Sequence, residues 1–310
     1  MRKLPVLLLL LGHFFIVPAQ VKITIPINVL EKDISKLVEL NDHTPGLVDM
    51  SGREAVRLMD SATALQIIKI TAPYMSSSVT NAKTVCENLL ARALLMKTES
   101  QLQKETIVEI LCKNYLNENE FYKVHTILLT LTQKDFNEKA KQYVTSIINN
   151  PGVCNDRAAY TVLGLAQIKK SIPFLWKQVG EGGNNIGMQT KLDIWASLAR
   201  MGEKKAALLL CNYYDSVRKE KGYWSIFAAK QMAFAMDRHV LGCLVSDYKK
   251  IDIKYSYRDG DTGFHPAQVL GGAITVMLKE YPYKKGEYNI DPQQLLDWLN
   301  QRKQYLLAEK

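Results

Sequence analysis

The chain has 310 residues, of which 47% are hydrophobic and 23% are charged, with 17 Gly and 10 Pro. This composition is that of a folded globular protein, and it excludes a disordered chain, a collagen-like fibre and a polytopic membrane protein. Lys and Arg number 40 against 31 Asp and Glu, and the resulting net charge of +9 favours anionic partners.

Residues 1–19 have the pattern of a secretory signal peptide. Arg2 and Lys3 precede an apolar run from Leu4 to Val17, and Ala19 is a small residue at the expected signal-peptidase cleavage site. The run is shorter than the roughly 20 residues that a transmembrane helix needs, which disfavours the alternative of a membrane anchor. No Asn-x-Ser/Thr sequence occurs, which favours a bacterial envelope. We therefore predict an exported protein, periplasmic or secreted, with no transmembrane segment in the mature chain.

The mature chain is predicted to be helical after a short extended start. Residues 20–45 form an N-terminal arm and a first helix in this prediction, because residues 21–28 alternate apolar and polar around Pro26. Farther along, apolar residues recur at steps of three and four, which gives each helix one apolar stripe. Residues 46–150 are expected to form irregular helical hairpins joined by short loops.

Residues 151–310 contain an internal repeat. Each copy has a first helix ending in small apolar residues, a polar turn and a second helix, and Pro173 suits the first turn of that second helix. Aligned on Ala166, Ala199 and Ala235, the copies are spaced by 33 and 36 residues. A period in this range predicts an all-α fold, an α-solenoid of stacked antiparallel helix pairs.

The segment from Leu163 to Leu175 resembles a HEAT-type repeat of the short variety first noted in phycobilisome lyase-like proteins. It has the leucine–glycine stretch, the turn and the Ile172-Pro173 start of the second helix, and Asp237 matches the acidic turn residue typical of that family. The resemblance implies a superhelix of stacked pairs over residues 151–310 and a binding role. It does not imply lyase activity.

The five cysteines are far apart in the sequence, and none belongs to a Cys-x-x-Cys pair. A zinc ribbon and a thioredoxin-like site are therefore not expected. One or two disulfides remain an alternative in an oxidising compartment, but the sequence does not show which cysteines would pair. The flanking residues favour the interpretation of Cys86, Cys112 and Cys211 as small core residues on helices.

Basic residues recur at one point of the repeat, the turn between its two helices. They are Lys169, Lys170, Lys204, Lys205, Arg238 and His239. Stacking of the copies would align these residues as a basic ridge able to attract an anionic partner. The alternative is ordinary solvation, helped by favourable cations near helix C-termini.

Residues 251–265 break the helical pattern and are predicted to be an inserted loop. Residues 251–258 alternate like a strand, and Asp259, Asp261 and His265 follow in a turn-rich stretch. Two acids and a histidine are groups that acid–base catalysis uses, so a hydrolase or lyase with this site is the alternative function. A solvated turn is the simpler interpretation, because such residues are common in turns.

No standard catalytic, dinucleotide-binding or metal-binding motif is present, so we expect no enzyme, no cofactor and no metal. The leading hypothesis is an exported, non-catalytic scaffold that binds a protein or an anionic envelope polymer rather than nucleic acid. A structural subunit of a larger assembly is a third hypothesis, which predicts a large apolar surface patch.

Overall fold

The computed structural model describes Lys32 and residues 64–76, 86, 90, 93–94, 100–115, 131–149, 157–180, 186–221, 226–251, 253, 266–283, 285, 290–302 and 304–308. The chain divides into two compact units, residues 1–99 and residues 100–310. The predicted signal peptide, the residues of the extended arm and most of the loop at 251–265 lie outside the described residues.

The first unit contains the helix α3 (Ala64–Thr71), which continues into the 3₁₀ turn η2 (Ala72–Ser76). Ala64, Ile67 and Ile70 are buried, as expected from their spacing of three residues on one helix face. Thr71 is buried too, and its hydroxyl donates to the carbonyl of Ile67 at 2.8 Å.

The second unit begins with α5 (Gln101–Tyr115), η3 (Gln133–Asp135), α7 (Glu138–Ser146) and η4 (Ile147–Asn149). Asn137 caps α7, where its side chain accepts a hydrogen bond from the N–H of Ala140 at 2.8 Å. Its amide also donates to Glu109 of α5 at 3.0 Å. The cap therefore fixes the start of one helix and ties it to the helix on which it packs.

Helix pairs follow in the order that the sequence predicts. Their bounds are α8 (Arg157–Leu165) with η5 (Lys169–Ser171) and α9 (Ile172–Val179), α10 (Met188–Arg200) with α11 (Lys204–Lys221), and α12 (Ile226–Ala235) with α13 (Arg238–Tyr248). The last helices are α14 (Pro266–Met277) and α15 (Pro292–Asn300). The described residues of the chain are thus organised as helices and turns, which confirms the all-α prediction for this part.

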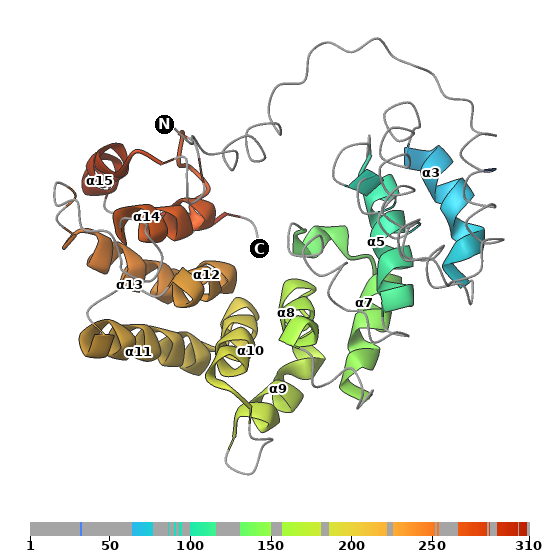
Figure 1. Cartoon of the computed structure of the whole chain (residues 1–310), viewed down its shortest axis with the longest axis horizontal. Coiled ribbons are helices and arrows are strands. Elements are labelled where there is room, and N and C mark those ends of the chain that lie inside the picture. The colour runs from blue at the N-terminus through green and yellow to red at the C-terminus, as the bar shows by residue number, and fades with distance from the viewer. Residues whose placement is uncertain are drawn as a thin grey trace, which may run out of the picture. The chain divides into compact units, whose positions relative to one another are not determined.

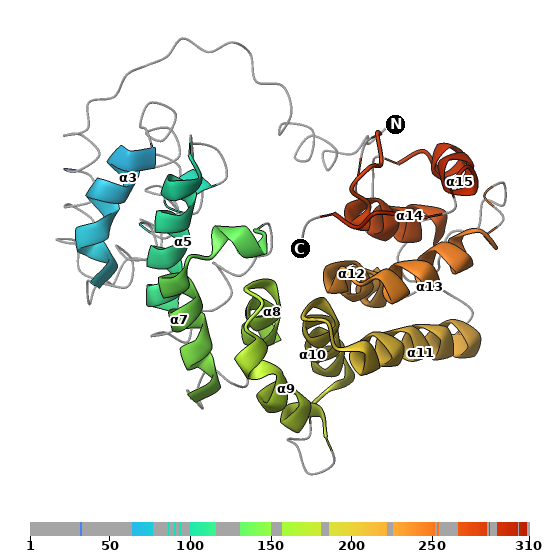
Figure 2. The ribbon, with the colours of Figure 1, turned by 180° about the vertical axis from the view of Figure 1, so that it is seen from behind.

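The first helix of each pair packs on the first helix of the next. Contacts join α8 to α10, α10 to α12 and α12 to α14, while α11 contacts α13 on the second-helix side. Figure 1 and, from behind, Figure 2 show this succession of helices. Because α10 has neighbours on several sides, nearly all of its side chains from Leu192 to Arg200 are buried.

Glycine allows α8 and α10 to approach closely. A Cβ at Gly164 would lie 2.6 Å from the Cβ and 2.7 Å from the Cα of Ser197. No side chain fits between these two helices at that point, so the small residue is required by packing rather than by backbone conformation.

Polar side chains, several of them buried, join successive helices at both ends of this row. Near the start of the helices, Arg157 Nε donates to Asp193 Oδ2 at 2.6 Å, and its guanidinium lies 5.1 Å from the centroid of the Phe227 ring. These three residues belong to α8, α10 and α12 respectively. Burial raises the pKa of Asp193, and the nearby Arg157 charge opposes that rise.

At the other end, each helix pair forms one layer of the row, and side chains from one layer donate hydrogen bonds to helix-end carbonyls of the next layer. Gln167 Nε2 donates to the carbonyl of Arg200 at 2.9 Å, and Arg200 Nη1 donates to the carbonyl of Phe234 at 2.7 Å. Arg200 is only 5% exposed, and burial lowers its pKa to about 10. Carbonyls at helix ends lack partners within their own helix, so these bonds fix each layer on the next.

The C-terminal segment closes against the end of α14. The N–H of Lys279 donates to the carbonyl of Leu306 at 2.9 Å, and the N–H of Ala308 donates to the carbonyl of Met277 at 2.7 Å.

Among the described residues, no helix combines the length and the apolar character needed to cross a bilayer.

Candidate functional site

The three turns between paired helices have a positive φ at equivalent positions. Each contains a residue in the left-handed region: Gln167 at φ 57°, Gly202 at φ 101° and Met236 at φ 46°. The first two turns also have the same hydrogen bonds, since the N–H of Ile168 donates to Leu163 and that of Glu203 to Leu198, both at 3.0 Å. This six-to-one bond is characteristic of a helix that ends in a left-handed residue.

The turn conformation corrects the alignment of the repeats. Gln167, Gly202 and Met236 are spaced by 35 and 34 residues. Ala199 is therefore equivalent to Gly164 and not to Ala166, so the spacings of 33 and 36 residues predicted from Ala166, Ala199 and Ala235 are wrong. The alanine match failed because small residues occur both three residues and one residue before the left-handed residue, and the sequence does not say which of these two positions an alanine occupies.

In the corrected alignment the basic residues match position by position. Lys169, Lys204 and Arg238 occupy the second position after the left-handed residue, and Lys170, Lys205 and His239 occupy the third. We call these six the basic turn residues. All six are exposed, and within the described part of the chain no ion pair joins any of them to a carboxylate.

The three turns follow one another directly in space. Ser171 Oγ in the first turn lies 4.0 Å from the sulfur of Met201 in the second. Lys205 Nζ of the second turn lies 5.4 Å from the ring centroid of Trp176 in α9. The second and third turns are joined by the bond from Arg200 to Phe234 described above. Packed helices lie about 8–10 Å apart, so we expect a similar spacing between the backbones of successive turns.

Two acidic side chains near these turns already have partners. Asp237 caps α13, since its Oδ1 accepts hydrogen bonds from the N–H groups of His239 at 2.8 Å and Val240 at 3.2 Å. Glu203 accepts a hydrogen bond from Trp176 Nε1 at 3.1 Å. The carboxylates therefore order the turns, and the lysine and arginine side chains project without being neutralised by a direct ion pair.

Helix ends act on the basic turn residues in two directions. Lys204 and Lys205 are the first residues of α11, and Arg238 and His239 are the first residues of α13. A cation is unfavourable at the N-terminal end of a helix by about 0.3–1 kcal/mol, and the C-terminus of the preceding helix across the turn opposes this effect. The alternative that cations gain stability near helix C-termini therefore stays a prediction.

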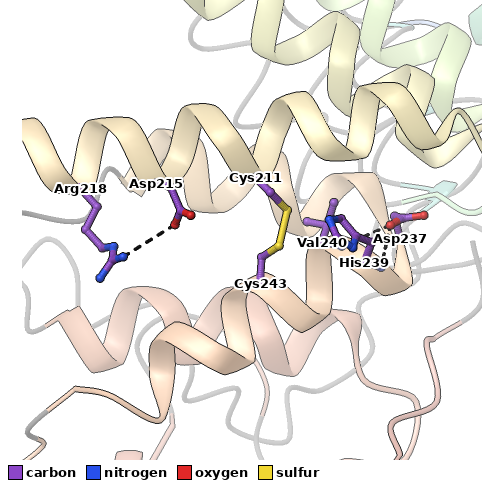
Figure 3. Close-up of a disulfide and its surroundings, with 7 residues drawn as sticks. All are labelled: Cys211, Asp215, Arg218, Asp237, His239, Val240 and Cys243. Atoms are coloured by element: carbon purple, nitrogen blue, oxygen red, sulfur yellow. Dashed lines mark hydrogen bonds and ion pairs between the residues drawn. A yellow bond between two sulfur atoms is a disulfide. The ribbon is translucent and has the colours of Figure 1, made fainter.

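A second cluster lies beside the third turn, on the facing sides of α11 and α13. Cys211 and Cys243 form a disulfide with their Cα atoms 6.4 Å apart, and His239 lies beside it (Figure 3). The expectation that Cys211 is an ordinary core residue holds for its burial, but its sulfur is bonded. Cys86 and Cys112 are buried as expected, and burial raises the pKa of the Cys112 thiol to about 12.

Sequence reasoning missed this cluster because its parts are distant in the chain. His239 and Cys243 are one helical turn apart, a spacing that places both on one face of α13. Cys211, however, is 32 residues before Cys243. The one usable sequence signal was the spacing of the two cysteines, which is close to the repeat length and therefore places them at similar heights on two stacked helices.

The alternative site cannot be placed from the structure, because Asp259, Asp261 and His265 lie outside the described residues. Ile251 and Ile253 lie in a bend and a turn after α13, and no strand is formed at these two positions. The expectation of a catalytic loop at 251–265 therefore stays a prediction.

Comparison with known proteins gives no relative from which a site could be transferred. No family model, no curated protein and no solved structure matches the chain.

Proposed function

We propose that this protein is an exported, non-catalytic α-solenoid scaffold of HEAT-like helix pairs, and that it binds an anionic macromolecule along the basic turn residues. The observation that carries the proposal is the recurrence of exposed basic residues at the same two positions after the left-handed residue of three consecutive turns. Repeat proteins place their variable, partner-binding residues in this way because each repeat contributes one equivalent position to a continuous surface.

The spacing of the charges supports an extended polyanion as the partner. Adjacent layers are about 8–10 Å apart, comparable with the Debye length of about 8 Å at physiological ionic strength. The fields of neighbouring turns therefore overlap, and an anionic polymer or an acidic protein face would meet several cations at once. Such a surface raises the association rate and makes binding sensitive to salt.

The disulfide supports the prediction of export. Cys211–Cys243 is of a kind that persists in the periplasm or outside the cell and is rare in a reducing cytosol. Action by binding rather than by catalysis stays a prediction, and so does the absence of a cofactor.

The test is binding of the mature chain to immobilised heparin, used as a defined polyanion. The variant carries Lys169→Glu, Lys170→Glu, Lys204→Glu and Lys205→Glu. We expect its affinity to fall by about tenfold or more, because four of the six basic turn residues reverse their charge. Glutamate is favourable in the first turn of a helix, so α11 is expected to remain folded in this variant.

The matched control has the same net charge and carries Lys139→Glu, Lys191→Glu, Lys230→Glu and Lys279→Glu. These four lysines lie outside the three turns. The control is expected to keep most of the affinity. Equal losses in the two variants would show that only net charge matters, and they would remove the proposed ridge.

A further inference from the structure

We propose that Cys211, Cys243 and His239 form a metal site for a thiophilic cation of the Zn²⁺ class, and that the disulfide is the closed, oxidised state of this site. In the reduced state the two thiolates and the imidazole would bind one ion. His239 is also one of the basic turn residues, but the inference does not rest on their role as a binding surface, since it concerns the positions of three ligand atoms.

The positions of the ligand atoms carry the inference. The two sulfur atoms and a ring nitrogen of His239 all lie within 4.8 Å of one another. Zn²⁺ holds sulfur at about 2.3 Å and imidazole nitrogen at about 2.0–2.1 Å, so ligands around one ion are separated by less than about 4 Å. Small rotations of the side chains are enough to meet this geometry once the S–S bond is broken.

The backbone positions of the three ligands are fixed independently of the disulfide. The α11 and α13 helices are also joined through Asp247, which is buried on α13 and accepts a hydrogen bond from the Tyr214 hydroxyl at 3.2 Å. Arg218 Nη1 lies 3.1 Å from the other carboxylate oxygen. These contacts hold Cys211 opposite Cys243 in either redox state.

The environment of the cluster suits an ion that enters from solvent. Cys211 is buried, Cys243 is half-buried and His239 is exposed. Two thiolates and a neutral imidazole balance the charge of a divalent cation, and soft sulfur ligands favour Zn²⁺ over Mg²⁺ or Ca²⁺. Among the described residues no fourth side chain completes the set, which leaves one position for water or for a ligand from a partner.

The nearby carboxylates are already used in other contacts. Asp237 accepts the N–H groups at the start of α13, and Asp215 lies 3.8 Å from Arg218 on its own helix (Figure 3). The site is therefore a three-ligand Cys₂His site with an open position.

Thiol–disulfide exchange interconverts the disulfide and the metal-binding dithiol. A dithiol reductant transfers two electrons and two protons to the disulfide, which breaks the S–S bond and gives two thiols while the reductant forms its own disulfide. Metal binding then releases both thiol protons. In the reverse direction a disulfide oxidant takes two electrons from the two sulfurs, the S–S bond re-forms and the ion leaves. An oxidising compartment favours the closed state, and a thiol reductant favours the metal-bound state.

The experiment is a titration of the mature protein with Co²⁺, an optical substitute for Zn²⁺, before and after reduction with a dithiol that is then removed without oxygen. We expect the reduced protein to bind one equivalent, with a thiolate-to-cobalt charge-transfer band that Zn²⁺ abolishes. The oxidised protein is expected to show no such band. His239→Asn is expected to keep the fold and weaken binding by at least about tenfold, since even indirect changes around a metal commonly cost 10–100-fold.

Asn212→Gln is the control, because it changes an exposed, uncharged residue next to Cys211 that is not a ligand in the cluster. It is expected to bind Co²⁺ like the unaltered protein. The proposal is overturned if the reduced protein gives no charge-transfer band, or if His239→Asn and Asn212→Gln bind Co²⁺ equally well. Loss of the helical circular dichroism on reduction would also overturn it, because the site requires folded α11 and α13.

Discussion

At the scale of single residues, two glycines in helices have opposite roles. Gly164 of α8 faces Ser197 of α10, whereas a Cβ at Gly242 of α13 would have no heavy atom within 4 Å. Glycine in a helix interior costs about 0.5–1 kcal/mol relative to alanine, and only a packing constraint justifies it.

Gly164→Ala is therefore expected to lower the free energy of unfolding by about 1–3 kcal/mol, because the new methyl group forces α8 and α10 apart. Gly242→Ala is expected to raise it by about 0.5–1 kcal/mol. Urea unfolding followed by circular dichroism measures both. If the two variants change stability in the same direction, the close approach of α8 and α10 is wrong.

Asp135 shows how a buried carboxylate keeps its charge. It accepts hydrogen bonds from the N–H of Thr132 at 2.7 Å and from the Thr132 hydroxyl at 3.0 Å, and Lys104 Nζ lies 2.9 Å away. Burial alone would raise the pKa of Asp135, but these hydrogen bonds and the Lys104 charge outweigh it and lower the pKa.

A lowered pKa in the folded state makes stability depend on acid in a defined direction. The contribution of Asp135 is complete above the pKa of an unfolded Asp, about 3.9, and is lost as the pH falls through the lower pKa of the folded state. Asp135→Asn is therefore expected to be less stable than the unaltered protein near pH 6, with a difference that shrinks toward pH 2. Thermal unfolding across this range measures the difference. Asp297→Asn, on an exposed position, serves as the control, and a gap for Asp135→Asn that does not change with pH would contradict the assignment.

At the scale of helices, the layers are fixed by side chains that cap the next layer. Gln167 acts on the end of α10, and Arg200 of α10 acts on the end of α12. Arg200 also lies over the Phe234 ring, with its guanidinium carbon 4.9 Å from the ring centroid. A buried arginine in this position connects two helices that are not consecutive in the chain.

Arg200→Met keeps the length of the side chain but removes the donor to Phe234. We expect a loss of about 1–3 kcal/mol in the free energy of unfolding, because a buried carbonyl loses its partner. Lys204→Met, on an exposed residue nearby, is expected to change stability by less than about 0.5 kcal/mol. Similar effects of the two substitutions, measured by urea unfolding, would remove the structural role given to Arg200.

At the scale of the whole molecule, the disulfide links two second helices across a layer boundary. It closes a loop between residues 32 apart, and a loop of this length restricts the unfolded chain by about 3.7 kcal/mol in the chain-entropy account. Cys211→Ser combined with Cys243→Ser is therefore expected to lower the melting temperature and leave the protein folded at 25 °C. Differential scanning calorimetry measures the shift.

Reductant supplies the control for this double variant. Adding a dithiol is expected to lower the melting temperature of the unaltered protein by a similar amount and to leave that of the double variant unchanged. An equal fall in both proteins would mean that the reductant acts elsewhere, and the link between α11 and α13 would not be the stabilising element.

The sequence by itself determined the all-α character and the paired helices of residues 157–248. Apolar residues at steps of three and four, Pro173 at a helix start and the polar turns around Gly202 are local signals, and they specify local structure. The same signals placed the basic residues at the junctions between paired helices, and in the structure four of them are the first residues of α11 and α13.

Only the tertiary structure decided which residues of successive helix pairs are equivalent and which of them come into contact. The left-handed turn position is occupied by Gln167, Gly202 and Met236, and only one of these is the glycine that would mark it in a sequence. The burial of Arg200 and the pairing of Cys211 with Cys243 depend on helices from different layers meeting. Contacts between distant residues are products of packing, and no local pattern of residues records them.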